Sequence, residues 1–248
     1  MTLLYVKIKS MDKYDVSLIL ACYNEVEVFE DSVERIVNAL NKTDYTWEII
    51  FVDDKSQDST VKLIKKVLKK YSRQNLSVIY HQQNQGRGQT VVDGFQKAKG
   101  KFVGYIDIDL ETSEWYMPQF FEALEQGADV VLAWRIYDFQ LRALPRWIGS
   151  KGYVILRKLL LGLPYQDTEG GYKFFRRSKI APLLKKVKHQ GWFFDTEIMT
   201  LCFKYNLKVK EIPVAFIRRF DKTSTVKFIP DTIEYLKNLV KFSLEFKK

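Results

Sequence analysis

The segment EIIFVDDKSQDSTVKLIKKVLKKYSRQNLSVIYH, residues 48–81, places a helix pattern between two strand patterns. Residues 48–54 and 76–81 are short apolar runs of the kind found in buried strands. Between them, apolar residues recur at the three-to-four spacing of one helix face: Val61, Ile64, Val67, Leu68 and Tyr71. A strand, a helix and a strand in this order predict a βαβ unit, whose two strands run parallel.

The same alternation extends to both sides of this unit. Further strand patterns occupy residues 16–23, 102–109 and 129–134. The sequence therefore predicts an α/β fold with a mostly parallel sheet and helices on both faces. Sheets of this kind bind ligands beyond the carboxyl ends of their strands.

Acidic and amide side chains follow three of the expected strands at that end. They are Asn24 and Glu25 after the first strand, Asp53 and Asp54 after the second, and Asp107, Asp109 and Glu111 after the fourth. Because the carboxyl ends of parallel strands meet at one edge of the sheet, we expect these side chains to converge there. Their convergence predicts a ligand site at this edge.

The acids of GYIDIDLET, residues 104–112, alternate with apolar residues. On an extended strand this alternation would put the three acids on one side, with neighbouring carboxylates roughly 7 Å apart. Two such carboxylates repel each other by about 2 kcal/mol at an effective dielectric constant of 20, so a buried cluster would need a cation or a proton. A solvated strand end would explain the same pattern, and the segment alone leaves both interpretations open.

The composition restricts the class of protein. The chain has 248 residues, of which 46% are hydrophobic, enough for the core of one domain with or without an appendage. Its two cysteines, Cys22 and Cys202, lie in apolar surroundings and suggest neither a disulfide framework nor a zinc cluster. A net charge of +10 is compatible with a polyanionic partner or simply with a soluble surface. No run of 18 apolar residues occurs, so we expect a soluble or peripheral protein.

The character of the sequence changes after residue 134. Segment 135–165 combines basic residues and tryptophan with a dense apolar stretch, and an amphipathic helix pattern covers residues 229–248. We expect one domain over residues 1–228, followed by this C-terminal helix. The apolar stripe of the helix, made of Ile229, Ile233, Leu236 and Val240, would pack on the domain or face a bilayer.

Four segments in this order resemble a known family. LILACYNE, EIIFVDDKSQDST, NQGRGQTVVDGFQKAKGKFVGYIDIDLE and DTEGGYKFFRR are similar to segments of the nucleotide-sugar-dependent family-two glycosyltransferases. The resemblance is to the dolichyl-phosphate mannose and glucose synthases and their bacterial polyprenyl-phosphate relatives, and it covers roughly residues 16–235. It implies a GT-A fold, which agrees with the α/β pattern.

The resemblance also implies a donor site. Ala21, Tyr23 and Glu25 fall in the family's P-A-Y-N-E segment, and Asp53 and Asp54 fall in its D-D-x-S segment, both of which surround the base and ribose. Ala21 and Cys22 stand where the family has Pro-Ala, a departure that we expect to change loop stiffness more than chemistry.

The diphosphate and the metal ion complete that implied donor site. Arg87 matches the basic position of N-x-G-K-G and would meet the diphosphate, while Gly86 and Gly88 would let the backbone approach phosphate. Asp107, Asp109 and Glu111 match the D-x-D-x-Q element. Asp107 would contact ribose or metal, and Asp109 and Glu111 would hold Mg²⁺ or Mn²⁺, which prefer oxygen ligands. Glu111 replaces the family's usual glutamine.

The acceptor side is implied by an R-x-x-x-S segment. Arg146 and Ser150 match it in RWIGS, and Arg135 and Arg142 are further candidates for binding a lipid phosphate. Asp107, Asp109 and Arg146 are therefore the expected catalytic residues. Asp195 or Glu197 would orient the sugar or acceptor, or else only begin a helix. The family's later Ser-Lys pair is Ser224–Thr225 here, and Lys222 or Lys227 would supply the missing cation.

The reaction that this resemblance implies is an inverting transfer of a hexose from UDP-glucose or GDP-mannose to a polyprenyl phosphate. DTEGGYKFF is closer to the form of the glucosyl members. We expect an enzyme peripherally associated with the cytoplasmic face of a membrane. A family-two enzyme with a soluble sugar or protein acceptor, and a catalytically degenerate nucleotide-sugar binder, remain alternatives. A nucleic-acid-binding protein is not expected, because the acids would repel a phosphate backbone and no recognition motif occurs.

Overall fold

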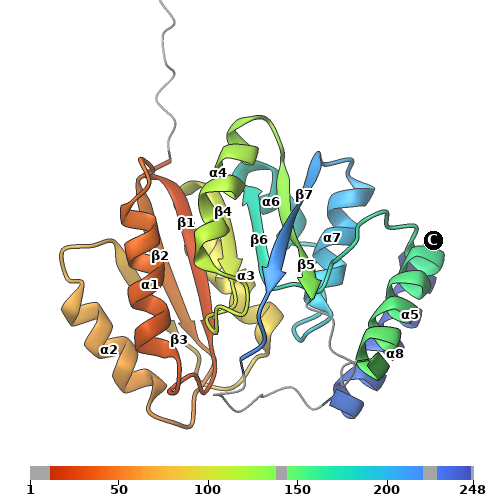
Figure 1. Ribbon diagram of the computed structural model, residues 1–248, viewed down its shortest axis with the longest axis horizontal. Coiled ribbons are helices and arrows are strands. Elements are labelled where there is room, and N and C mark those ends of the chain that lie inside the picture. Colours follow the sequence, from red (N-terminus) through yellow and green to blue (C-terminus); the bar gives the residue numbers. More distant parts are fainter. Residues whose placement is uncertain (1–11, 138–143, 220–227, 247–248) are drawn as a thin grey trace, which may run out of the picture.

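Parallel strands joined by helices form the first part of the sheet, as the alternating patterns predict (Figure 1). The computed structural model describes residues 12–137, 144–219 and 228–246, and the side chains of all of these except 144–151, 228–231 and 246. The chain passes through β1 (Tyr14–Cys22), α1 (Phe29–Asn41), β2 (Trp47–Asp53), α2 (Thr60–Lys70), β3 (Leu76–Tyr80), α3 (Arg87–Lys97) and β4 (Gly100–Ile106). β2 pairs in parallel with β1 and β3, and β1 pairs in parallel with β4.

One antiparallel strand interrupts this order in the second part. The chain continues through η1 (Glu114–Tyr116), α4 (Met117–Glu125), β5 (Val130–Tyr137), α5 (Leu144–Leu161), β6 (Tyr172–Arg176), α6 (Arg177–Leu184), α7 (Phe194–Lys204), β7 (Val209–Phe216) and α8 (Phe228–Phe246). The seven-stranded sheet has the order β3-β2-β1-β4-β6-β5-β7, and β6 is antiparallel to both of its neighbours. β5 and β7 are parallel. The expected mostly parallel sheet is confirmed, and its antiparallel member was not predicted.

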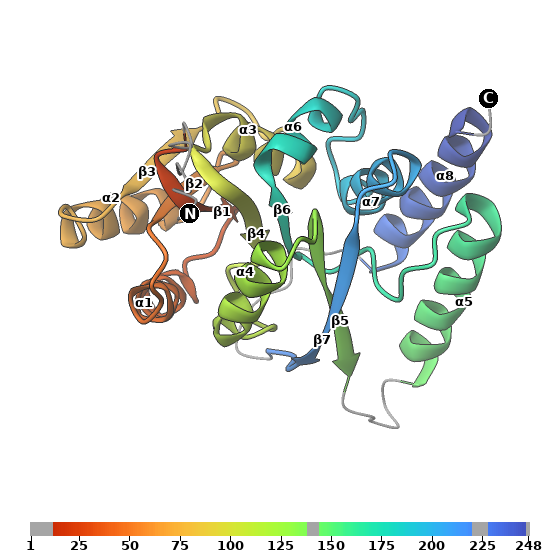
Figure 2. The ribbon, with the colours of Figure 1, turned by 90° about the horizontal axis from the view of Figure 1, so that it is seen from above.

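Helices cover both faces of the sheet, which also confirms the sequence prediction (Figure 2). One buried cluster joins the sheet to α1, α2 and α4, and a second joins it to α3, α6 and α7. All seven residues of β2 are buried, because a central parallel strand has a helix layer on each side. Cys22 and Cys202 are buried free thiols.

α5 and α8 lie side by side at one end of the molecule (Figures 1 and 2). α8 packs through Leu239 and Phe242, which are buried in the same cluster as Phe193 of the segment before α7. The expected C-terminal helix is confirmed, but Ile233 and Val240 of its predicted stripe are 48% and 47% exposed. α5 carries two more exposed residues, Ile155 and Leu159. No helix among the described residues is long and apolar enough to cross a membrane.

β4 ends earlier than the sequence predicts. Its last residue is Ile106, and Asp107 to Glu111 follow in a turn in which Leu110 has a φ of 53°. The strand expected over residues 102–109 is therefore wrong at its end. Ile108 and Leu110 are nevertheless buried, so the turn reproduces the apolar alternation that we had attributed to an extended strand.

Candidate functional site

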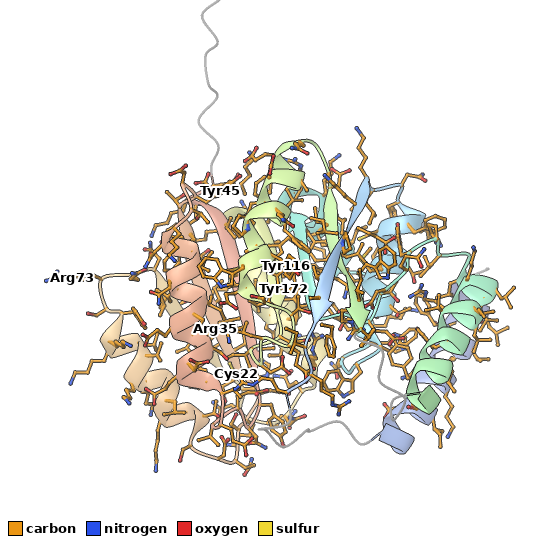
Figure 3. All side chains as sticks on the ribbon, in the orientation of Figure 1. Cys22, Arg35, Tyr45, Arg73, Tyr116 and Tyr172 are labelled. Carbon is orange, nitrogen blue, oxygen red and sulfur yellow. The ribbon has the colours of Figure 1, made fainter. Side chains whose placement is uncertain are left out.

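The carboxyl ends of β1, β2 and β4 meet at the lower edge of the sheet in Figure 1, and Cys22 marks the end of β1 in Figure 3. Three residues directly after these strands, Asn24, Lys55 and Leu110, have positive φ values of 58°, 65° and 53°. Residues other than glycine rarely adopt this conformation, and backbone strain of this kind concentrates at functional sites. Three of the four described non-glycine residues with positive φ thus lie at the edge that the sequence predicts as a ligand site, and the fourth, Asn206, follows α7.

The three acids of the turn line one small pocket. Its wall comprises Asp107, Asp109, Glu111, Thr112, Arg135, Gly170, Gly171, Tyr172 and Phe216. Tyr172, labelled in Figure 3, packs its ring 4.8 Å from that of Phe120, and its buried hydroxyl has no hydrogen-bond partner in the part of the chain that the structure describes. Asp107, Asp109 and Glu111, three of the acids expected at this edge, therefore line one pocket, in a turn rather than along a strand.

Arg87 connects this pocket to a buried cluster of charges. Its Nη2 lies 2.6 Å from Asp107 Oδ1, and its Nη1 pairs with Asp195 Oδ2. Asp195 Oδ1 also accepts hydrogen bonds of 2.5 Å from Lys173 Nζ and from the hydroxyl of Tyr105. Two carboxylates therefore face two cations, and the cluster carries no net charge.

Burial acts to lower the pKa values of Arg87 and Lys173, and the neighbouring carboxylates act to raise them. Burial lowers the pKa of Lys173 below its usual value, although Asp195 opposes this change. Burial also acts to lower the pKa of Arg87, but Asp107 and Asp195 outweigh it and raise that pKa. Burial and the Asp195 carboxylate raise the pKa of Tyr105, so its hydroxyl stays protonated and donates to Asp195. Arg87 therefore stays protonated and keeps its positive charge.

Asp53 and Asp54 are adjacent in sequence but differ in their contacts. Asp54 Oδ1 accepts from Gln85 N at 2.7 Å and contacts His81 Nδ1 at 2.8 Å, while Oδ2 accepts from Gly86 N at 2.9 Å. Asp53 is equally buried, yet its Oδ1 has no hydrogen-bond partner among the described residues and its Oδ2 accepts one long bond from Ser56 N at 3.3 Å. Asp54 therefore holds the loop before α3, whereas the Oδ1 atom of Asp53 is a buried acceptor without a partner in that part of the chain.

Gly86, directly before α3, and Gly88, in its first turn, both lie against the segment before α7. Gly86 has a φ of 89°, and a Cβ atom there would lie 2.8 Å from the carbonyl oxygen of Gln190. A Cβ atom at Gly88 would lie 2.5 Å from Cβ of Phe194. Gln190 O also accepts from Gln89 N. The backbone of the segment before α7 therefore approaches both glycines closely, and their expected approach to phosphate stays a prediction.

The segment after β1 is tied to the segment after β2. Asn24 Oδ1 accepts from Gln57 N, and Glu25 N donates to Thr60 Oγ1. Ala21, Tyr23 and Glu25, the three donor residues implied here, are partly exposed. They lie at the edge of the sheet that also carries Asp53, as the resemblance implies.

The acceptor residues are only partly described. Arg135 lines the pocket of the acids, and its guanidinium pairs with Asp167 through Nε at 2.6 Å and Nη2 at 3.1 Å. Arg142 lies outside the described residues. Arg146 and Ser150 lie in the first part of α5, and only the backbone of these two residues is described. Lys222 and Lys227 also lie outside the described residues.

Asp195 and Glu197 have different surroundings. Asp195 belongs to the charge cluster of Arg87, so its role is not limited to the first turn of a helix. Glu197 accepts from the backbone N–H groups of Lys188 and His189 at 3.0 and 2.8 Å, and it fixes the segment before α7.

Sequence reasoning missed several residues around the site. Lys173 lies in the quoted DTEGGYKFFRR segment, but a fully buried lysine has no marker in sequence. Trp192 lies over the Arg87 guanidinium at 5.5 Å and is 44% exposed. Arg157 of α5 is buried and donates to Thr168 Oγ1 at 2.7 Å. It thereby attaches α5 to the loop that carries Asp167.

The acids fit a divalent ion that takes part of its ligands from elsewhere. The side chains around the pocket supply carboxylate oxygen, which suits Mg²⁺ or Mn²⁺. Within the described part of the chain, however, no group of three or more His, Cys, Asp or Glu side chains is placed to hold a metal ion. The predicted metal site is therefore not a preformed cage, and Asp107 is engaged by Arg87.

Solved structures with a similar fold include two solved with a uridine nucleotide. Glucosyl-3-phosphoglycerate synthase from Mycobacterium tuberculosis, solved with Mn²⁺, UDP and glucosyl-3-phosphoglycerate, has a TM-score of 0.67 and 17% identity, with 92% of this chain and 80% of that chain covered. Staphylococcus aureus TarS 1–349, solved with UDP-GlcNAc, has a TM-score of 0.57 and 17% identity, with coverage of 91% and 65%. At this identity the likeness concerns the fold alone, and it confirms the expected GT-A-like arrangement.

Sequence relatives identify the family more closely. The profile of glycosyl transferase family 2 matches residues 17–184, which is more than half of the chain. The protein therefore belongs to glycosyl transferase family 2.

Two curated relatives are dolichyl-phosphate beta-glucosyltransferases. That of Dictyostelium discoideum is 28% identical over 220 residues, with 82% of this chain and 67% of that protein covered. That of Saccharomyces cerevisiae is 26% identical over 251 residues, with 90% and 72% covered. Glycosyltransferase AglD of Haloferax volcanii is 27% identical over 206 residues, with 81% of this chain covered, and the match spans 32% of its length.

Proposed function

We propose that this protein transfers a hexose from a nucleoside diphosphate sugar to a polyprenyl phosphate, with inversion at the sugar carbon. The acid-lined pocket beside Arg87 is the observation that carries the proposal, because it sets carboxylates and a cation where a metal-bound diphosphate would need both. The names of two relatives support dolichyl phosphate as the acceptor and glucose as the sugar. UDP-glucose is therefore the preferred donor, ahead of GDP-mannose.

The donor would lie along the edge formed by β1, β2 and β4. Asp53 would accept a hydrogen bond from the base or ribose through its unpartnered Oδ1. Asp107, Asp109 and Glu111 would hold Mg²⁺ or Mn²⁺, and a bound ion would stabilise the negative charge of the departing diphosphate. Arg87 would add a fixed positive charge on the same side.

The acceptor phosphate needs positioning rather than a strong base. A phosphate monoester has a second pKa near 6 and is largely ionised at neutral pH. Arg135 lies in the wall of the pocket and Arg146 lies on α5, and both would bind the acceptor phosphate. Arginine suits this task because its planar group donates two parallel hydrogen bonds to one phosphate.

The end of the molecule formed by α5 and α8 would face the membrane that contains the lipid. The described residues of the two helices expose Ile155, Leu159, Ile233, Val240 and Leu244. A chain with a net charge of +10 would also be attracted to anionic lipids. Arg146 lies near the start of α5, so the lipid head group would meet it at the surface of the bilayer.

A transfer assay tests the proposal. Labelled UDP-glucose and GDP-mannose are offered with Mn²⁺ to a short-chain polyprenyl phosphate, and product is measured in the organic phase. We expect labelled lipid from UDP-glucose. Labelled product only with water-soluble acceptors would favour the soluble-acceptor alternative. Donor binding without any turnover would favour the degenerate binder.

A further inference from the structure

We infer that the ion pair between Arg87 and Asp107 keeps a divalent ion from binding to Asp107 in the nucleotide-free protein. The ion then binds to Asp107 only together with a diphosphate, which attracts Arg87 away from this carboxylate. The inference rests on the proposed donor site and adds an order of binding to it. It starts from the two carboxylates that Arg87 bridges, which have very different surroundings.

The contact with Asp195 is the permanent one. The Asp195 side chain is 2% exposed, and Lys173 and Tyr105 hold the same carboxylate at 2.5 Å. Breaking a buried ion pair of this kind leaves an uncompensated charge in the protein interior, which is strongly unfavourable. Arg87 therefore stays attached to Asp195 whatever binds at the edge of the sheet.

The contact with Asp107 is the exchangeable one. The Asp107 side chain is 48% exposed, against 2% for Asp195, so water can solvate the Asp107 carboxylate when Arg87 leaves it. Asp107 also lines the pocket that contains Asp109 and Glu111. When Arg87 is paired with Asp107, this carboxylate is not available as a ligand for a divalent ion. The nearby guanidinium also repels the ion.

The guanidinium also contacts two aromatic rings. Its central carbon lies 5.4 Å from the centroid of Tyr105 and 5.5 Å from that of Trp192. Rotation about the Asp195 contact would let Nη2 leave Asp107 for a phosphate oxygen while the group keeps its aromatic neighbours. The same movement pairs Arg87 with the diphosphate and leaves Asp107 available to the divalent ion. Binding of the nucleotide and binding of the metal ion are therefore coupled.

The test measures binding of Mn²⁺ itself, by the electron paramagnetic resonance signal of the free ion, with and without UDP. We expect wild-type protein to bind Mn²⁺ weakly alone and at least about tenfold more tightly with UDP. Arg87→Met should bind Mn²⁺ without UDP about tenfold more tightly than wild type, because the competing charge is gone. Arg87→Lys keeps a charge and should resemble wild type.

Lys101→Met is the matched control, since it removes one positive charge from the exposed Lys101–Glu125 pair. An equal gain in Lys101→Met and Arg87→Met would attribute the effect to net charge and overturn the inference. Wild-type affinity for Mn²⁺ that is the same with and without UDP would also overturn it, without touching the proposed reaction. A wild-type protein that binds neither UDP nor Mn²⁺ under any condition would instead count against the proposed function.

A second variant guards against misfolding. If Arg87→Met loses the cooperative unfolding transition, Arg87→Gln removes the positive charge but keeps an N–H donor beside Asp195, and the buried Asp195–Lys173 pair stays intact. The inference predicts that Arg87→Gln, too, binds Mn²⁺ more tightly than wild type in the absence of UDP. No gain in the folded Arg87→Gln variant would contradict it.

Discussion

The main chain of Gly171 passes so close to Asp107 that a Cβ atom at position 171 would lie 2.1 Å from Asp107 Oδ2. The same Cβ atom would lie 2.3 Å from Arg87 Nη2. Asp107 N donates to Gly171 O at 2.8 Å, so the two segments are also joined through their backbones. The residue directly before β6 thus makes room for the ion pair because it has no side chain.

Gly171→Ala should displace the Asp107–Arg87 pair and lower kcat/KM by roughly 100-fold, the scale of effect that misplacing reacting groups by about 1 Å produces. The measurement is steady-state transfer together with a melting curve. Gly191→Ala is the control, because nothing lies within 4 Å of a Cβ atom there. Equal activity in the two variants would contradict the close approach at Gly171.

Asp53→Asn and Asp54→Asn should separate binding from stability. Asp54→Asn leaves the N–H groups of Gln85 and Gly86 with one carboxylate acceptor fewer, and we expect about 1–3 kcal/mol less stability. Asp53→Asn removes a buried charge that has few partners, so its melting temperature should stay close to wild type while donor affinity falls. Chemical denaturation and donor titration of both variants give the comparison. The reverse pattern would exchange the roles of the two acids.

Asp109→Ala should abolish transfer and metal-dependent donor binding while the fold remains intact. The variant removes an oxygen ligand and also relieves repulsion among the three acids of the turn. Transfer and donor titration in Mn²⁺ measure both effects, with Asp31→Ala on the exposed surface of α1 as control. Unchanged turnover of Asp109→Ala would remove Asp109 from the metal site.

Arg146→Ala should weaken acceptor use by about 2 kcal/mol or more in transition-state terms, while donor affinity changes little. Arg146→Lys should recover only part of the loss, because a single ammonium cannot make the paired hydrogen bonds. The assay is transfer to a short-chain polyprenyl phosphate beside donor titration. Equal losses of both functions, or of neither, would point to a soluble acceptor.

Anionic liposomes should retain the protein at low salt and release it as salt rises. Leu159→Glu with Leu244→Glu should abolish retention, because these side chains are 73% and 66% exposed on α5 and α8. Trp115→Glu, at a position 54% exposed on η1, should still bind. Flotation of the protein with vesicles is the measurement. Equal retention by neutral and anionic vesicles would exclude an electrostatic contribution.

The arrangement of acids at one edge could be predicted because topology alone places the ends of parallel strands together. This rule alone was enough to predict that Asp53 and Asp107 lie at the same edge. The different contacts of Asp53 and Asp54 could not be predicted, since a one-residue step changes which face of the backbone a side chain leaves. The extended alternation expected for GYIDIDLET was wrong because a turn can bury every second residue just as a strand does.

The residues that the sequence did not reveal come from the second part of the chain. Lys173 lies on a strand of five residues, which is too short for a clear periodic pattern. Its pairing with Asp195 joins positions 22 residues apart that no local signal connects. The close approach of Gln190 to Gly86 and Gly88 could not be predicted either, because Gln190 is remote in sequence from both.

The insertion of β6 between β4 and β5 has a consequence for how the protein folds. β4 and β5 follow each other along the chain but are not neighbours in the sheet, so each presents an unpaired edge until residues 172–176 arrive. During synthesis the first five strands emerge before the one that joins them, and open strand edges favour pairing with other chains. We therefore expect folding to be slow and prone to aggregation until β6 inserts. The charge cluster that includes Lys173 can assemble only after that step.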